Sequence, residues 1–95
     1  MVSFTVRMTF DPADRDAIEE ILSHLTPPTR REPGCVSYIP HFVGGDACTV
    51  LIYEQYKDEA ALDHHRGTPH FHQYAIGGLY QKMKERQLEN LSAIC

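Results

Sequence analysis

The sequence lacks three features that would each indicate a class of partner. No stretch approaches the run of about 20 apolar residues that a membrane span needs, and Met1–Phe10 has neither the basic start nor the continuous apolar run of a signal peptide. The nine Lys and Arg residues are scattered along a chain of net charge −4, which argues against nucleic acid or a membrane surface as the partner. We therefore expect a cytoplasmic protein that binds neither.

Paired cysteines are also missing. The three cysteines, Cys35, Cys48 and Cys95, are odd in number and widely spaced, so they predict neither a disulfide framework nor a CxxC site. We expect reduced thiols. The composition is otherwise that of an ordinary globular protein, with 42% hydrophobic and 23% charged residues. A length of 95 residues allows one hydrophobic core, so residues 1–95 are predicted to form a single domain.

The first third of the chain predicts a strand followed by a helix. Apolar residues alternate with polar ones from Val2 to Phe10, which is the pattern of a strand with one buried face. Asp11 and Pro12 then provide a helix cap and a favourable first helical residue. The apolar residues that follow fall on one stripe, and Pro27-Pro28 is predicted to end the helix.

The rest of the chain predicts two strands, a broken helix and a last strand. Cys35–Val43 and Ala47–Tyr56 are joined by Gly44-Gly45-Asp46, which predicts a hairpin, and Pro40 indicates an edge strand or a bulge. Asp58 caps a helix that ends at Gly67. Thr68-Pro69 opens a further helix that closes with Lys82, Lys84 and Arg86, and Leu88–Cys95 is predicted as the final strand. This order, βαββαβ with an antiparallel sheet, is the ferredoxin-like α+β fold.

The third predicted strand is apolar on both faces, with Val50 and Ile52 on one and Leu51 and Tyr53 on the other. Helices on one side of the sheet would cover only one of these faces. A second copy of the chain is the simplest cover for the other face, so we expect a homodimer.

Four histidines lie between positions 64 and 72. A metal site is disfavoured, because the pattern HHxxxxHxH matches no common ligand motif and Gly67 separates the pairs into two helices. His64 and His72 are expected on the surface. His65 follows Leu62 by three residues, which places it on the buried side of its helix, and His70 stands in the first turn of the next. These two are either hydrogen-bonded core residues or general bases beside an apolar cavity.

Aromatic residues give a second indication of a ligand cavity. Several tyrosines and phenylalanines lie on elements that would face one space between sheet and helices, although such residues are as often simply core. A mostly apolar cavity with a few polar groups suits a flat aromatic ligand. The candidates for substrate binding are Tyr38, Phe42, Tyr53, Phe71 and Tyr74, with Tyr56 and Tyr80 near them.

Two groups of motifs resemble a known family. The run Tyr53–Leu62, followed by His65 and by Thr68-Pro69-His70-Phe71, is similar to the E-x-W/Y, A-L-x-x-H and T-P-H-F pattern of the antibiotic biosynthesis monooxygenases, and Glu32-Pro33-Gly34-Cys35 matches their E-x-G-C turn. The resemblance implies a dimeric α+β barrel with a pocket between each sheet and its helices. It also implies oxidation by molecular oxygen without flavin, metal or haem, so that no cofactor is expected.

The expected function is therefore a cofactor-independent monooxygenase for a small phenolic, quinol or anthrone-type substrate. His65 or His70 would act as the base, and Tyr56 would be the third catalytic residue, although many relatives carry Trp at this position. Two alternatives stay open. One is an isomerase of a small, phosphorylated dihydroxy-ketone, a branch that the Tyr53–Glu59 run resembles, and the other is a dimeric barrel that binds a small molecule without chemistry.

Overall fold

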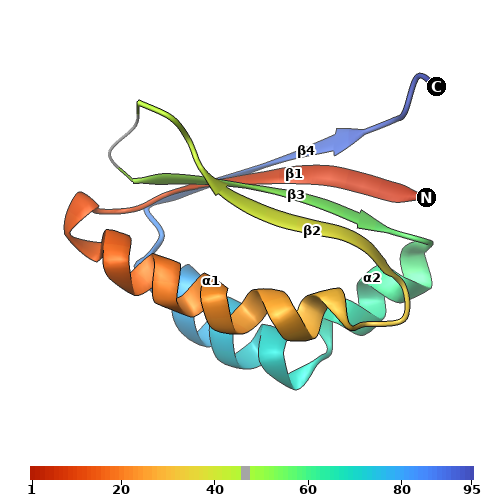
Figure 1. Ribbon diagram of the computed structural model, residues 1–95, viewed down its shortest axis with the longest axis horizontal. Coiled ribbons are helices and arrows are strands. Elements are labelled where there is room, and N and C mark those ends of the chain that lie inside the picture. Colours follow the sequence, from red (N-terminus) through yellow and green to blue (C-terminus); the bar gives the residue numbers. More distant parts are fainter. Residues whose placement is uncertain (46–47) are drawn as a thin grey trace.

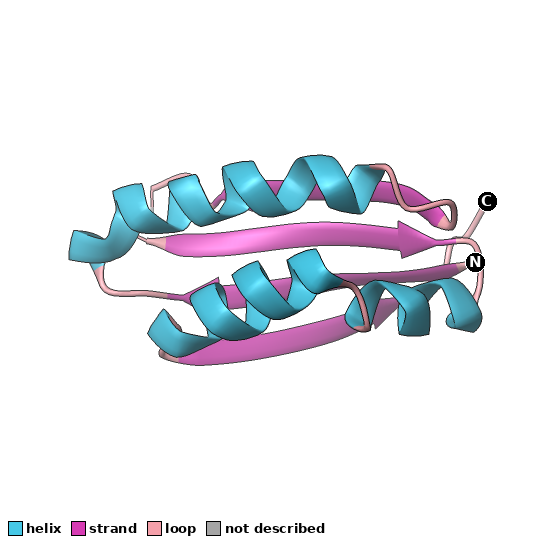
Figure 2. Cartoon of the chain, turned by 90° about the horizontal axis from the view of Figure 1, so that it is seen from below, coloured by secondary structure: helices cyan, strands magenta, loops and turns pink. Residues whose placement is uncertain are grey.

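The computed structural model describes residues 1–45 and 48–95, and it has two layers. A four-stranded antiparallel sheet in the order β2-β3-β1-β4 forms one layer, and all the helices cover the same face of it (Figures 1 and 2). The predicted ferredoxin-like α+β fold is confirmed. The strands are β1 (Val2–Thr9), β2 (Cys35–Phe42), β3 (Thr49–Tyr56) and β4 (Glu85–Leu91), and the helices are η1 (Pro12–Asp14), α1 (Arg15–Arg30), α2 (Glu59–Arg66), η2 (Phe71–Leu79) and α3 (Tyr80–Lys82).

The first helix begins as predicted but ends later. Asp11 accepts a hydrogen bond from the amide of Ala13 at 2.9 Å, and a short 3-10 turn, η1, precedes α1. The prediction that Pro27-Pro28 ends the helix is wrong, because α1 continues through both prolines to Arg30. The buried Thr29 donates its hydroxyl to the carbonyl of Leu25 at 2.8 Å, and packing on the sheet keeps this last turn helical although two amides are missing.

The hairpin of β2 and β3 lies at one edge of the sheet, with β2 outermost. Pro40 therefore stands on an edge strand, as predicted, and a register shift lies between Cys35 and Ser37. β3 begins at Thr49 instead of Ala47. Asp46 and Ala47 of the predicted turn and strand lie outside the described residues.

The second half of the chain confirms one helix and corrects the boundaries of two other elements. Asp58 accepts from the amide of Ala61 at 2.8 Å, and Gly67 ends α2 as predicted. The next helix, η2, has π geometry. β4 spans Glu85–Leu91 instead of Leu88–Cys95, and its pairing with β1 runs from Glu85 opposite Thr9 to Leu91 opposite Ser3. Lys84 and Arg86 consequently follow the helix and do not lie in it.

The core lies between the sheet and the helices. Phe4, Val6 and Met8 of β1 face α1 and η2, together with alternate residues of β3. The opposite face of the sheet has no helix over it (Figure 1), and Leu51 and Tyr53 are only partly buried there. None of the helices in the described residues is long and apolar enough to cross a membrane.

Candidate active site

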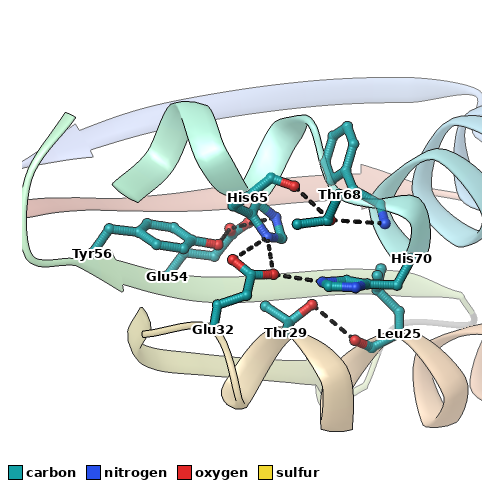
Figure 3. A network of polar contacts seen from close by, with 9 residues as sticks. Leu25, Thr29, Glu32, Glu54, Tyr56, His65, Thr68 and His70 are labelled. Atoms are coloured by element: carbon teal, nitrogen blue, oxygen red, sulfur yellow. Dashed lines mark hydrogen bonds and ion pairs between the residues drawn. The ribbon is translucent and has the colours of Figure 1, made fainter. Parts of the chain in front are cut away.

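A buried carboxylate joins the two histidines that the sequence singled out (Figure 3). Oε2 of Glu32 lies 2.9 Å from Nδ1 of His65 and 2.5 Å from Nε2 of His70. The side chain of Glu32 is 5% exposed and that of His65 is 3% exposed. One carboxylate oxygen thus fixes both imidazole rings, and water is excluded from most of the network.

Glu32 reaches this position because the turn after α1 is tightly closed. The Glu32 amide donates to the carbonyl of Thr29 at 3.1 Å, and the Glu32 carbonyl accepts from the amide of Cys35 at 3.1 Å. Two residues later, a Cβ at Gly34 would lie 2.3 Å from Cβ of Ala61. Only glycine lets this turn approach α2 so closely, and the approach brings Glu32 beside His65.

The hydrogen bond to Glu32 determines which nitrogen of His65 is available for chemistry. A carboxylate only accepts, so Nδ1 carries the proton and Nε2 of a neutral ring keeps its lone pair. Burial lowers the pKa of His65, while the hydrogen bond to Glu32 opposes that shift. Nε2 points toward Glu54, whose Oε1 is 3.8 Å away. His65 is therefore held as a neutral imidazole with a free acceptor on the inner side.

Glu54 on β3 is the second buried carboxyl of the site. Burial raises its pKa from 4.5 to about 7, and its hydrogen bond from Tyr56 partly offsets this. The Tyr56 hydroxyl donates to Oε1 of Glu54 at 2.7 Å. Burial, followed by the nearby charge of Glu54, raises the pKa of Tyr56 well above its ordinary value, so Tyr56 stays a neutral donor. The site thus pairs a neutral imidazole with a carboxyl whose pKa lies near neutral pH.

Thr68 ties the segment between α2 and η2 to His65. Its hydroxyl donates to the carbonyl of His65 at 2.7 Å and accepts from the amide of Phe71 at 3.3 Å. This places His70 at the start of η2, where its side chain is 18% exposed. The ring of Phe71 meets the ring of His65 edge-on, with centroids 5.0 Å apart.

A narrow cavity of about 30 Å³ adjoins His65 and Glu54 between the sheet and the helices. Its volume accommodates about one water-sized group, so a substrate needs side chains at the opening to move aside. Phe71 and Tyr80 are half-buried there and are the side chains best placed to do so. The remaining walls are formed by Phe4, Val6, Met8, Tyr38, Ile52, Leu62, Arg66, Ala75, Leu79 and Arg86.

The structure brings together some of the expected substrate-binding residues and separates others. Tyr38 and Phe71 line the cavity, whereas Tyr56 does not line it. Its hydroxyl contacts Glu54, and its ring lies 5.2 Å from that of His65 (Figure 3). Phe42 lines a different groove, between α1 and β2.

Two further tyrosines also lie away from the cavity. Tyr74 stacks on His24 of α1. Tyr53 alternates with the inward-facing residues of β3 and lies on the uncovered face of the sheet. Phe42, Tyr74 and Tyr53 therefore do not share the site of His65.

Gly67 separates His65 and His70 into two helical segments, as expected, but their rings still approach each other, with centroids 6.4 Å apart. His64 and His72 are exposed, as expected. In the described part of the chain, Glu32, His65 and His70 are the one group of ligand-type side chains close enough to hold a metal ion, with one potential ligand atom each and all three within 4.8 Å of one another. As arranged, Nδ1 of His65 and Nε2 of His70 both hydrogen-bond to Oε2 of Glu32.

Sequence reasoning gave no role to Glu32 or Glu54, although both lie in the motifs quoted above. The available signal was the presence of an acidic residue inside otherwise apolar or turn segments, since a carboxylate is rarely buried without a partner.

Comparison with known proteins identifies a family that the sequence matches. Residues 1–75 match the family model described as Antibiotic biosynthesis monooxygenase. A Mycobacterium tuberculosis protein named "Putative monooxygenase Rv0793" is 36% identical over 73 residues, which are 77% of this chain and 71% of that protein.

Solved structures agree with the sequence match. The crystal structure of PA3566 from Pseudomonas aeruginosa has a TM-score of 0.89 at 28% identity, covering 99% of this chain and 94% of the other. The structure of Rv0793 has a TM-score of 0.87 at 28% identity, covering 99% and 95%. The chain therefore belongs to the antibiotic biosynthesis monooxygenase family.

Proposed function

We propose that this protein is a cofactor-independent monooxygenase that oxidises a small phenolic, quinol or anthrone-type substrate, with His65 as the general base. The observation that carries the proposal is the hydrogen bond from Nδ1 of His65 to Glu32, which leaves Nε2 free on the side of the cavity. A carboxylate behind an imidazole fixes its tautomer and stabilises the imidazolium that forms when the ring takes a proton.

The chemistry needs no electron donor besides the substrate. For an anthrone, Nε2 of His65 removes a proton from the methylene carbon and leaves a carbanion conjugated with the ketone. The carbanion transfers one electron to O₂, and the resulting radical and superoxide combine and take up a proton to form a hydroperoxide. Loss of water from the hydroperoxide gives the second carbonyl, so that CH₂ and O₂ become C=O and H₂O.

His70 and Tyr56 act through their neighbours in this proposal. His70 shares Oε2 of Glu32 with His65 and keeps that oxygen directed between the two rings. Tyr56 donates to Glu54 and holds that carboxyl next to Nε2 of His65. Both are positioning residues, because the hydrogen-bonding atom of each already contacts a carboxylate.

One observation favours an isomerase as the second candidate. Glu54 has a pKa of about 7 and lies 3.8 Å from Nε2 of His65, so a base and a proton donor stand together. Such a pair can remove a proton from one carbon of a hydroxy-ketone and return it to the next. This reaction consumes no oxygen.

Oxygen uptake distinguishes the two candidates. The purified chain is placed in an oxygen electrode with a panel of quinols and anthrones, and His65→Gln is compared with His64→Gln, which alters an exposed neighbour on the same helix. We expect uptake above the substrate's autoxidation with the unaltered chain and His64→Gln, and a loss on the order of 10²–10⁴-fold for His65→Gln. Background uptake throughout, together with rearrangement of a phosphorylated dihydroxy-ketone, would select the isomerase.

A further inference from the structure

Two arginines stand at the opening of the His65 cavity. Arg66 is the last residue of α2 and Arg86 lies on β4, so the two come from elements far apart in the sequence. Both side chains line the same cavity as His65 and Glu54, and both residues are exposed. Arg86 is opposite Met8 in the β1–β4 register, so it shares the helix-covered face of the sheet with the core.

Neither guanidinium is used by an ion pair within residues 1–45 and 48–95. Arg86 lies over the ring of Tyr80, with Cζ 5.6 Å from the ring centroid, and this contact leaves its N–H groups available to a ligand. The chain has a net charge of −4, so two positive charges at one opening contrast with the molecule as a whole and would attract an anion to this place.

The charges of both arginines also extend into the cavity. Each favours the ionised form of Glu54 and so opposes the rise in the pKa of that carboxyl. A negative charge that develops on a substrate beside His65 would be stabilised in the same way. A guanidinium also presents paired N–H groups that match the two oxygens of a carboxylate or a phosphate.

From this arrangement we infer that Arg66 and Arg86 form an anion subsite, and that the substrate carries a carboxylate or phosphate group beside its enolisable or phenolic part. The inference rests on the proposed function for the reacting end of the substrate. The anionic group is bound outside the narrow cavity, and the carbon or hydroxyl that loses its proton is directed inward to His65.

The test is a binding titration without oxygen, in which no turnover takes place. Isothermal titration under nitrogen compares hydroquinone with 2,5-dihydroxybenzoate, which differs only by a carboxylate. We expect the carboxylate to improve binding by about tenfold, as a charge-assisted hydrogen bond would. Inorganic phosphate, followed through the Nε–H NMR signals of the arginines, tests the subsite without the aromatic ring.

Three variants identify the subsite. Arg66→Gln and Arg86→Gln should each remove most of the preference for 2,5-dihydroxybenzoate over hydroquinone, measured as the ratio of the two affinities within each variant. Lys57→Gln removes one positive charge from an exposed position outside the cavity and should keep the preference. Circular dichroism and a thermal melt confirm that each variant is folded.

Equal affinities for the two compounds would overturn the inference. So would failure of 2,5-dihydroxybenzoate to bind, or an equal loss of preference in Lys57→Gln, which would indicate general attraction by charge. Oxidation of hydroquinone without any preference for the carboxylate would keep the proposed function and remove only the subsite. Binding with the expected preference but no oxygen uptake would keep the subsite and remove the proposed function.

Discussion

At Glu32, a single carboxylate oxygen contacts two histidine nitrogens, at 2.9 Å and 2.5 Å. The carboxylate fixes the proton of His65 on Nδ1, and this is the tautomer that a base acting through Nε2 requires. If Glu32 became an amide, its side chain could present an N–H to either ring and stabilise the opposite tautomer. The whole site therefore depends on a residue that need not touch the substrate.

Glu32→Gln should lower kcat by at least about tenfold and change KM much less, because the variant misorients the base without removing it. The measurement is steady-state oxygen uptake with the substrate selected by the panel. Glu19→Gln, on the exposed part of α1, is the matched control. A kcat within twofold of that of the unaltered chain would show that His65 does not need this carboxylate.

Glu54 should make the stability of the fold depend on pH. Its pKa rises from 4.5 in the unfolded chain to about 7 in the folded one, so the folded state binds the proton more tightly. This contribution is fully present below pH 4.5 and is lost as the pH rises through 7. This rise in the pKa of Glu54 corresponds to about 3 kcal/mol at most in the free energy of unfolding.

The measurement for Glu54 is urea unfolding between pH 5 and 8. Glu54→Gln removes the titrating group and should flatten this part of the stability profile. His65 has the opposite sign, because its lowered pKa causes stability to be lost as the pH falls below 6.5. An unchanged fall in stability between pH 5 and 8 in Glu54→Gln would show that another group is responsible.

The residues of the site were only partly predictable from the sequence. His65 could be assigned to a buried face because helical spacing relates it to Leu62 three residues before. Glu32 lies 33 positions from His65, and no periodicity indicates which turn of the chain will pack beside which helix. The prediction that Tyr53 binds substrate beside His65 does not fit its place on the uncovered face of the sheet. Alternation along a strand predicts two faces but does not say which one the helices cover.

Among the elements, the turn between α1 and β2 and the helix α2 form one unit that carries Glu32 and His65. Gly34→Ala should disturb this unit, because the added Cβ would lie 2.3 Å from Cβ of Ala61. We expect a loss of about 1–3 kcal/mol in the free energy of unfolding and a drop in kcat. Gly44→Ala adds the same methyl group where nothing lies within 4 Å.

Urea unfolding of the two glycine variants provides the comparison. Gly44→Ala should remain close to the unaltered chain in both stability and kcat. If Gly34→Ala is equally stable and active, the turn does not need its close approach to α2, and the positioning of Glu32 must have another cause.

Element boundaries were predicted well where capping residues determine them. Asp58 and Gly67 mark the ends of α2 because each acts on adjacent backbone groups. Pro27-Pro28 wrongly predicts the end of α1, because packing of the buried Leu25 and Thr29 compensates for the missing amides. The π geometry of η2 has no simple signal in the sequence.

For the whole molecule, the uncovered face of the sheet is the feature from which we expect a homodimer. Ile39, Leu51 and Tyr53 share this face in the β2–β3 register, and Ile39 is 43% exposed. A second copy that packs face to face would bury them, so the homodimer predicted from the sequence remains our expectation.

Sedimentation velocity at micromolar concentration tests the dimer. The unaltered chain should sediment as a dimer and Leu51→Lys as a monomer, because the charge would be buried in the interface. Ile76→Lys places the same charge at an exposed apolar residue in η2, on the helix side, and should leave the dimer intact. A monomer for the unaltered chain would contradict the expectation, and the apolar face would then need another explanation.

The central claim is that Nε2 of His65, held by Glu32, removes a proton from the substrate. This proton removal can be measured as hydrogen exchange in the absence of oxygen. Anthrone is incubated with the protein in D₂O under nitrogen, and NMR follows the loss of its methylene C–H signal. The account predicts exchange above the buffer rate with the unaltered chain and His64→Gln, and a buffer rate with His65→Gln. An exchange rate in His65→Gln equal to that of the unaltered chain would contradict it.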